Sequence, residues 1–135
     1  MKTILVVDDD FGVRQLLRRV LEDLGHKVHD VESALDALEL LKTVTVDLAL
    51  CDVLMPGRDG VWLTDQILTR HPGTPVALAT GVLEMDPTVT LRAGVVGYIV
   101  KPFKRSAIVD LLEAAFEAPA RVRPAEIDLA AFDAI

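Results

Sequence analysis

The chain has 135 residues, of which 51% are apolar and 26% are charged, and these values are typical of a single globular domain. Its uninterrupted apolar runs are far shorter than the ~20 residues of a membrane-spanning helix, and its net charge of −7 argues against nucleic-acid phosphates as the main partner. The single cysteine, Cys51, cannot close an intrachain disulfide, so we expect a cytoplasmic protein rather than a membrane protein or a disulfide scaffold.

Short apolar segments alternate along the chain with segments of helical period. The apolar segments are rich in Val, Ile, Leu and Ala and have the length of buried strands. The predicted strands are residues 4–7, 28–31, 46–51, 75–79 and 95–100.

The segments that follow these strands predict five helices. Ser33, Asp86 and Ser106 stand where helix N-caps are expected, and Gly25 and Gly94 stand where helices should end. The predicted helices are residues 13–24, 34–41, 61–70, 87–93 and 107–116.

Strands that alternate with helices indicate an α/β fold, in which a single doubly wound parallel sheet of five strands carries helices on both faces. After residue 117 the composition of the sequence changes, because two prolines flank a short segment with two arginines. We therefore predict a domain over residues 1–118 and a C-terminal tail over residues 119–135, either a linker or a short accessory helix.

Polar side chains follow four of the predicted strands. Asp8 and Asp9 follow the first, Asp52 the third, Thr80 the fourth and Lys101 the fifth. Parallel strands place their carboxyl ends at one edge of the sheet, where α/β folds bind ligands. Three carboxylates and one ammonium leave a charge of −2 there, which a divalent cation offsets, and the all-oxygen donor set favours Mg²⁺, with Mn²⁺ as the alternative.

A divalent cation beside a carboxylate suits phosphoryl transfer, with a carboxylate as the acceptor. Asp52 is the best acceptor because it ends an apolar segment and precedes a turn at residues 55–60 that we expect to leave its carboxylate facing solvent. Lys101 and the Thr80 hydroxyl are placed to bind the phosphoryl oxygens.

Four segments together resemble the CheY-like receiver domain of two-component response regulators. The segments are residues 4–9 with Arg14, residues 52–60, Thr80, and residues 97–103. The resemblance covers about residues 2–117 and implies a flavodoxin-like sheet of strand order 2-1-3-4-5.

The resemblance implies a role for each site residue. Asp52 is the phosphoacceptor, and Asp8, Asp9 and Asp52 bind the metal together with the backbone carbonyl of Leu54. Thr80 and Lys101 bind the phosphoryl oxygens.

Two further features follow from the resemblance. Tyr98 is the aromatic switch that turns inward as Thr80 moves toward the phosphate. The peptide bond between Lys101 and Pro102 is cis.

The resemblance also implies partners. A histidine kinase or phosphotransfer protein donates the phosphoryl group, and the phosphorylated domain shifts to an active conformation that controls an unknown downstream protein effector. A homodimer through the surface of the fourth helix, fifth strand and fifth helix is left open. We expect no direct contact of this domain with nucleic acid or membrane, and no multi-turnover enzyme activity, only self-catalysed phosphorylation and slow autodephosphorylation.

Two alternatives stay open at the level of sequence. A phosphatase of the haloacid-dehalogenase type would use Asp8 as its nucleophile, but this leaves Asp52 and the turn at residues 55–60 unexplained, and no cap domain is visible. A receiver that is never phosphorylated and acts only as a binding module is weakened because every side chain needed for the chemistry is present.

Two positions depart from the polar residues that can occur in the family. Leu54 lies two residues after Asp52, and Val82 lies two residues after Thr80. Neither side chain can orient a water molecule, so we expect the phosphoryl group to decay slowly.

Overall fold

A five-stranded parallel sheet forms the centre of the protein, in the order β2-β1-β3-β4-β5. This is a computed structural model, and it describes residues 1–81 and 94–116. The strands are β1 (Thr3–Val7), β2 (Lys27–Val31), β3 (Leu48–Asp52), β4 (Val76–Gly81) and β5 (Val95–Lys101). The predicted fold class and strand order are therefore confirmed.

Four helices are described, α1 (Phe11–Asp23), α2 (Ala34–Leu41), α3 (Gly60–Arg70) and α5 (Arg105–Phe116). Each of the first three follows a capping residue whose side chain accepts a hydrogen bond from a backbone N–H of the first turn. The capping residues are Asp10, Ser33 and Asp59 respectively. Gly25, after α1, has a φ of 93°, a conformation that favours glycine. The predicted fourth helix falls on residues outside the described part of the chain.

The N-cap predicted for the last helix is wrong. α5 already includes Arg105, so Ser106 lies inside its first turn. The backbone carbonyl of Lys104 accepts hydrogen bonds from the N–H groups of Ala107 (3.0 Å) and Ile108 (3.4 Å). Lys104 therefore occupies the capping position, and the helix begins without the side-chain cap that a serine there would supply.

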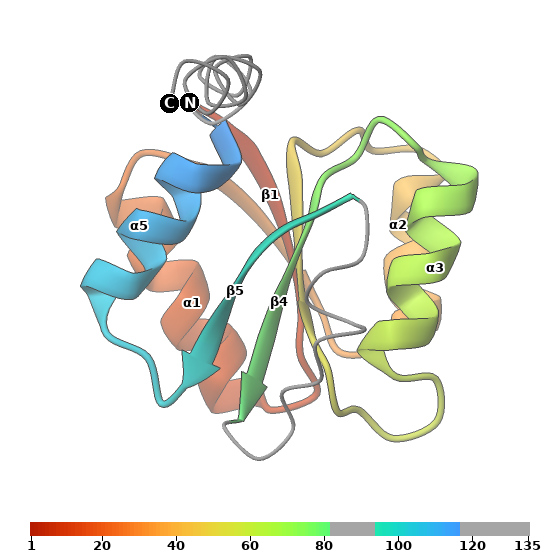
Figure 1. The fold of residues 1–135 in the computed structure, drawn as a ribbon, viewed down its shortest axis with the longest axis horizontal. Coiled ribbons are helices and arrows are strands. Elements are labelled where there is room, and N and C mark those ends of the chain that lie inside the picture. Colours follow the sequence, from red (N-terminus) through yellow and green to blue (C-terminus); the bar gives the residue numbers. More distant parts are fainter. Residues whose placement is uncertain (82–93, 117–135) are drawn as a thin grey trace, which may run out of the picture.

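The helices cover the sheet on both faces, with α1 and α5 on one face and α2 and α3 on the other (Figure 1). Successive side chains of a strand point to opposite faces. In β1, Leu5 and Val7 pack in the core beneath α2 and α3, whereas Ile4 and Val6 pack beneath α1 and α5. Because both faces are covered, the inner strands β1, β3 and β4 are buried and mostly apolar, as buried parallel strands are, whereas the edge strand β2 carries Lys27, His29 and Asp30.

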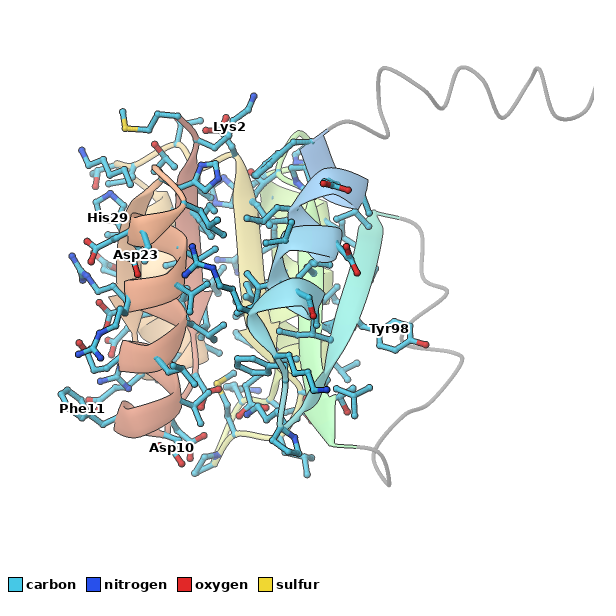
Figure 2. The ribbon with its side chains drawn as sticks, turned by 90° about the vertical axis from the view of Figure 1, so that its left-hand side faces the viewer. Lys2, Asp10, Phe11, Asp23, His29 and Tyr98 are labelled. Atoms are coloured by element: carbon cyan, nitrogen blue, oxygen red, sulfur yellow. The ribbon has the colours of Figure 1, made fainter. Side chains whose placement is uncertain are left out.

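The carboxyl ends of the strands meet at the lower edge of the sheet in Figure 1. Figure 2 places Asp10 at this edge and Lys2 at the opposite one. Strand order reverses between β1 and β3, because β2 lies on one side of β1 and β3 on the other. Such a reversal is where open α/β sheets bind ligands.

The other boundaries are only partly described. In residues 1–81 and 94–116, none of the helices is long and apolar enough to cross a membrane. The predicted domain boundary near residue 118 stays a prediction, because residues 117–135 lie outside the described part.

Gly60 is required where α3 begins, against the end of β3. A Cβ atom at this position would lie 2.1 Å from the backbone oxygen of Asp52 and 2.9 Å from its carbonyl carbon. Backbone atoms cannot rotate away, so we expect Gly60→Ala to lower the free energy of unfolding by ~2 kcal/mol or more, in the upper part of the range for overpacking. Urea unfolding monitored by circular dichroism measures it.

Gly73→Ala is the matched control for this substitution. A Cβ at Gly73 has no other atom within 4 Å, and the residue does not have a positive φ. Its effect should stay within ~0.5 kcal/mol. Equal losses in the two variants would contradict the steric argument.

Candidate functional site

The candidate site lies where β1, β3 and β5 end. Asp8 follows β1 directly, and Asp52 and Lys101 are the last residues of β3 and β5. The Lys101 ammonium donates a hydrogen bond to the carboxylate of Asp8 (3.0 Å) and lies 3.1 Å from that of Asp52. The peptide bond that follows Lys101, to Pro102, is cis as predicted. The structure therefore joins three strands through one cation.

Three carboxylates converge at this edge. One oxygen from each of Asp8, Asp9 and Asp52 can be chosen so that all three lie within 4.8 Å of one another. Asp8 and Asp52 are buried, whereas Asp9 is exposed. Asp9 therefore leaves the cluster open to an ion arriving from solvent.

The prediction that Asp52 faces open solvent is wrong, because the residue is only 6% exposed. β3 continues through Asp52, which pairs with Ala79 of β4. The following turn then folds back, and the N–H of Gly60 donates to the carbonyl of Val53 (3.0 Å). This return brings the start of α3 against the backbone carbonyl of Asp52.

The cluster fits a hard divalent cation. Its donors are carboxylate oxygens, which Mg²⁺ and Mn²⁺ prefer, and it contains no histidine or cysteine. With Lys101 counted, the four charged side chains carry −2, which one divalent ion would offset. Asp8, Asp9 and Asp52 are the side chains that would hold the ion.

Asp52 carries the electrostatic strain of the site. Burial raises its pKa to about 6, the negative charge of Asp8 adds to this, and Lys101 opposes it. Burial would lower the pKa of Lys101, but its hydrogen bond to Asp8 and the charge of Asp52 outweigh this and raise it. Lys101 is therefore a permanent cation at neutral pH.

Burial also decides the chemistry of the residue before Asp52. Cys51 is fully buried in the core beneath α2 and α3, and burial raises the pKa of its thiol to about 12. It stays protonated at neutral pH and offers no nucleophile to the site.

Thr80 lies on β4 one residue beyond the partner of Asp52. Its side chain is buried, and its hydroxyl donates to the carbonyl of Gly81 (3.1 Å). Thr80 pairs with Val100, the residue before Lys101. The sheet register thus brings Thr80 to the same edge as the charged cluster.

The structure leaves two other predicted site residues at the surface. Tyr98 on β5 is 43% exposed, and Figure 2 shows its ring pointing away from the sheet. Leu54, in the loop after β3, is 54% exposed. The switch role of Tyr98 and the metal-binding role of the Leu54 carbonyl stay predictions.

From the sequence, Arg14 was named only as part of the resemblance, without a role, and Asp30 was missed. Arg14 of α1 donates from its guanidinium to the backbone carbonyl of Asp8 (2.8 Å) and to the carboxylate of Asp30 on β2 (2.8 Å). For Asp30, the signal in the sequence was an acidic residue within a predicted strand, with an arginine on the preceding predicted helix.

Comparisons with known proteins agree on one family. The sequence model of the response regulator receiver domain matches residues 4–113. The chain is 38% identical over 113 residues to the DNA-binding transcriptional regulator NtrC of Escherichia coli, which covers 83% of this chain and 24% of NtrC. It is 33% identical over 112 residues to the chemotaxis protein CheY of Halobacterium salinarum, covering 82% of this chain and 93% of CheY.

Solved structures show the same likeness. The crystal structure of the receiver domain of NtrX from Brucella abortus has a TM-score of 0.79 and 33% sequence identity, and the match covers 84% of this chain and 98% of that one. The chain is thus comparable in length with isolated receivers, whereas it spans about a quarter of the length of NtrC (24%).

The raised pKa of Asp52 predicts how stability depends on pH in metal-free protein. Folding raises this pKa from an ordinary value near 3.8 to about 6, so Asp52 lowers stability as pH rises through that window. Asp52→Asn should stabilise the protein by ~1–2 kcal/mol at pH 7, since one unit of pKa shift is worth ~1.4 kcal/mol before solvent screening. The gain should vanish below about pH 4.

Urea unfolding in the presence of a chelator, from pH 4 to pH 8, measures this. Asp110→Asn is the control, because Asp110 is an exposed carboxylate on α5 and its loss should change stability by less than ~0.5 kcal/mol. A variant Asp52→Asn that is less stable than wild type at pH 7 would contradict the prediction.

Proposed function

Since the chain belongs to the family of response regulator receiver domains, we propose that Asp52 accepts a phosphoryl group from a histidine kinase or phosphotransfer protein. The observation that carries the proposal is the meeting of Asp8, Asp9, Asp52 and Lys101 at the carboxyl edge of the sheet. Receiver domains generally bind Mg²⁺ through such an acidic cluster, and we assign that role here to the three aspartates.

The chemistry needs positioning more than covalent assistance. A carboxylate oxygen of Asp52 attacks the phosphorus atom and forms the new O–P bond as the bond from phosphorus to the donor breaks. Lys101, already within 3.1 Å of Asp52, stays beside the charge that develops on the phosphoryl oxygens. Bound Mg²⁺ supplies further positive charge to this group.

Phosphorylation then changes what Lys101 and Thr80 bind. A phosphoryl group adds nearly two negative charges and strong acceptor oxygens. Thr80 would exchange the carbonyl of Gly81 for a phosphoryl oxygen, and Tyr98 would turn inward behind it. An active conformation gains population to the extent that these new contacts favour it.

The proposal extends to the partners of the domain. Receiver domains pair with histidine kinases and with effector domains, and we propose that this one controls a protein effector in the cytoplasm. Its own product stays covalently attached to Asp52, so it is a switch rather than a multi-turnover enzyme. The net charge of −7 supports the proposal that this domain itself does not bind DNA.

A phosphoryl adduct is the direct test. We expect wild-type protein, incubated with Mg²⁺ and a small acyl phosphate, to gain one phosphoryl group by intact mass spectrometry. Asp52→Asn and a chelator should each abolish the adduct, whereas Asp110→Asn should retain it. An adduct that survives in Asp52→Asn would indicate chemistry at Asp8, and no adduct on wild type would indicate a binding module.

The lifetime of the adduct tests the role of Leu54. Its side chain is apolar and exposed, and Val82, which lies outside the described residues, is apolar as well. We expect the double variant Leu54→Asn, Val82→Glu to lose the phosphoryl group ~10-fold faster than wild type, because the new polar side chains can orient the water molecule that attacks the phosphorus. This is less than the rate gain of a fully developed general base. Leu54→Ala, followed by the same mass measurement over time, should decay like wild type. Equal decay of the double variant and wild type would contradict the hypothesis.

A further inference from the structure

A second charged cluster lies behind the acidic site, between α1 and β2. Asp30 of β2 accepts hydrogen bonds from the guanidinium groups of Arg14 (2.8 Å) and Arg18, and from the side-chain amide of Gln15 (3.4 Å). The side chains of Arg14 and Asp30 are each only 11% exposed. A pair this buried needs a specific geometry, because two ions that have lost their water are costly unless well bonded.

The ion pair is firmly charged. Burial alone would raise the pKa of Asp30, but the hydrogen bonds from Arg14 and Arg18 outweigh it, so the pKa is lowered. Asp30 therefore stays ionised at neutral pH and offsets the charge of Arg14.

Arg14 also reaches the site itself, through the backbone. Its guanidinium donates to the carbonyl oxygen of Asp8 (2.8 Å), while the N–H of Asp8 donates to the carbonyl of Val31 at the end of β2 (3.2 Å). The main chain of Asp8 is thus held on one side by α1 and on the other by β2. Its two carboxylate oxygens accept from the N–H of Asp10 (2.9 Å) and from Lys101 (3.0 Å).

Arg14 and Asp30 are arranged to fix this geometry. An arginine fork bonds two acceptors in one plane, and here it joins a carboxylate of β2 to a carbonyl at the end of β1. Without that donor the buried carbonyl of Asp8 would lose its partner and the step to Asp9 would be free to turn. Mg²⁺ demands near-ideal octahedral geometry, so a small displacement of these ligands weakens its binding.

We propose that Arg14, held in place by Asp30, is a positioning residue that sets the main chain of Asp8 and thereby aligns the carboxylates of Asp8 and Asp9 for a divalent cation. The inference rests on the proposed metal site. Groups that orient metal ligands from behind typically change metal affinity 10–100-fold when they are removed.

Charge and geometry predict opposite results for Arg14, and this makes the test sharp. If only charge mattered, Arg14→Met would remove a cation from the neighbourhood of the site and strengthen Mg²⁺ binding. If positioning dominates, Arg14→Met should weaken Mg²⁺ binding by ~10-fold or more. Arg14→Lys should weaken it too, because a single ammonium cannot replace the planar fork between Asp8 and Asp30.

Mg²⁺ alone is titrated into metal-free protein, and amide chemical shifts in NMR spectra report both the affinity and the residues that respond. Asp30→Asn should weaken binding in the same direction as Arg14→Met. Arg19→Met is the matched control, because Arg19 is an exposed arginine of the same helix; its loss should change affinity by less than about twofold, as expected for a surface charge. Urea unfolding of each variant separates a loss of stability from a loss of affinity.

The outcomes separate the two proposals. Unchanged or tighter Mg²⁺ binding in the folded Arg14 and Asp30 variants, while Asp9→Asn binds weakly, would overturn the positioning role alone. Two results would overturn the metal site and the positioning role together: wild-type protein that binds no Mg²⁺, or equal Mg²⁺ affinities of wild-type protein and Asp9→Asn. If Arg14→Met fails to fold, Arg14→Lys decides the question, because it keeps the positive charge and removes only the planar fork.

Discussion

The site depends on the ion pairs that the ammonium of Lys101 forms with the carboxylates of Asp8 and Asp52. Three carboxylates cannot lie within 4.8 Å of one another without compensation, and Lys101 supplies part of it to Asp8 and Asp52. It can do so only because β1, β3 and β5 end at the same edge of the sheet. Burial and the remaining charge imbalance raise the pKa of Asp52 to about 6, so the folded protein keeps an unfavourable charge where we propose that a cation and a phosphoryl group bind. Stability and binding are thus set against each other at one residue, as is common at functional sites.

Much of the fold could be predicted from the sequence because its signals are local. Apolar strands separated by helical periodicity predict a parallel sheet, and Ser33 caps α2 as its position indicates. Ser106 shows where such signals fail, because a serine caps only when the chain enters the helix at that residue, and the chain enters α5 two residues earlier, at Lys104. The acidic site could also be predicted, because strand ends in a parallel sheet meet whatever lies between them. Its burial could not, because the neighbours of Asp52, such as Ala79 on β4 and Lys101 on β5, meet it only in the folded structure.

The two cations of the site act on different parts of Asp8. Lys101 bonds its carboxylate, whereas Arg14 bonds its carbonyl and leaves the carboxylate to the cluster. Asp30 makes this division possible, because it neutralises Arg14 and holds its guanidinium away from the acidic side chains. The role of Asp30 was hidden in the sequence because its partners are distant along the chain: Arg14 lies 16 residues before it. Only the packing of α1 against β2 brings Arg14 to Asp30 and to the carbonyl of Asp8.

The same contacts limit how a phosphoryl group can act on the domain. A ligand shifts a conformational equilibrium only through interactions that differ between the two states. In the structure Thr80 bonds the carbonyl of Gly81, and Lys101 bonds two carboxylates, so under the proposed function both groups would exchange partners when phosphoryl oxygens arrive. Both stand at the carboxyl ends of the neighbouring strands β4 and β5, which pair along their length and carry Tyr98 opposite Leu78. Arg14 and Asp30, in contrast, bond to each other and to Asp8 and Arg18, on the side of the sheet formed by β1, β2 and α1. We therefore propose that the half of the sheet with β1 and β2 holds the site in place while the half with β4 and β5 carries the conformational change.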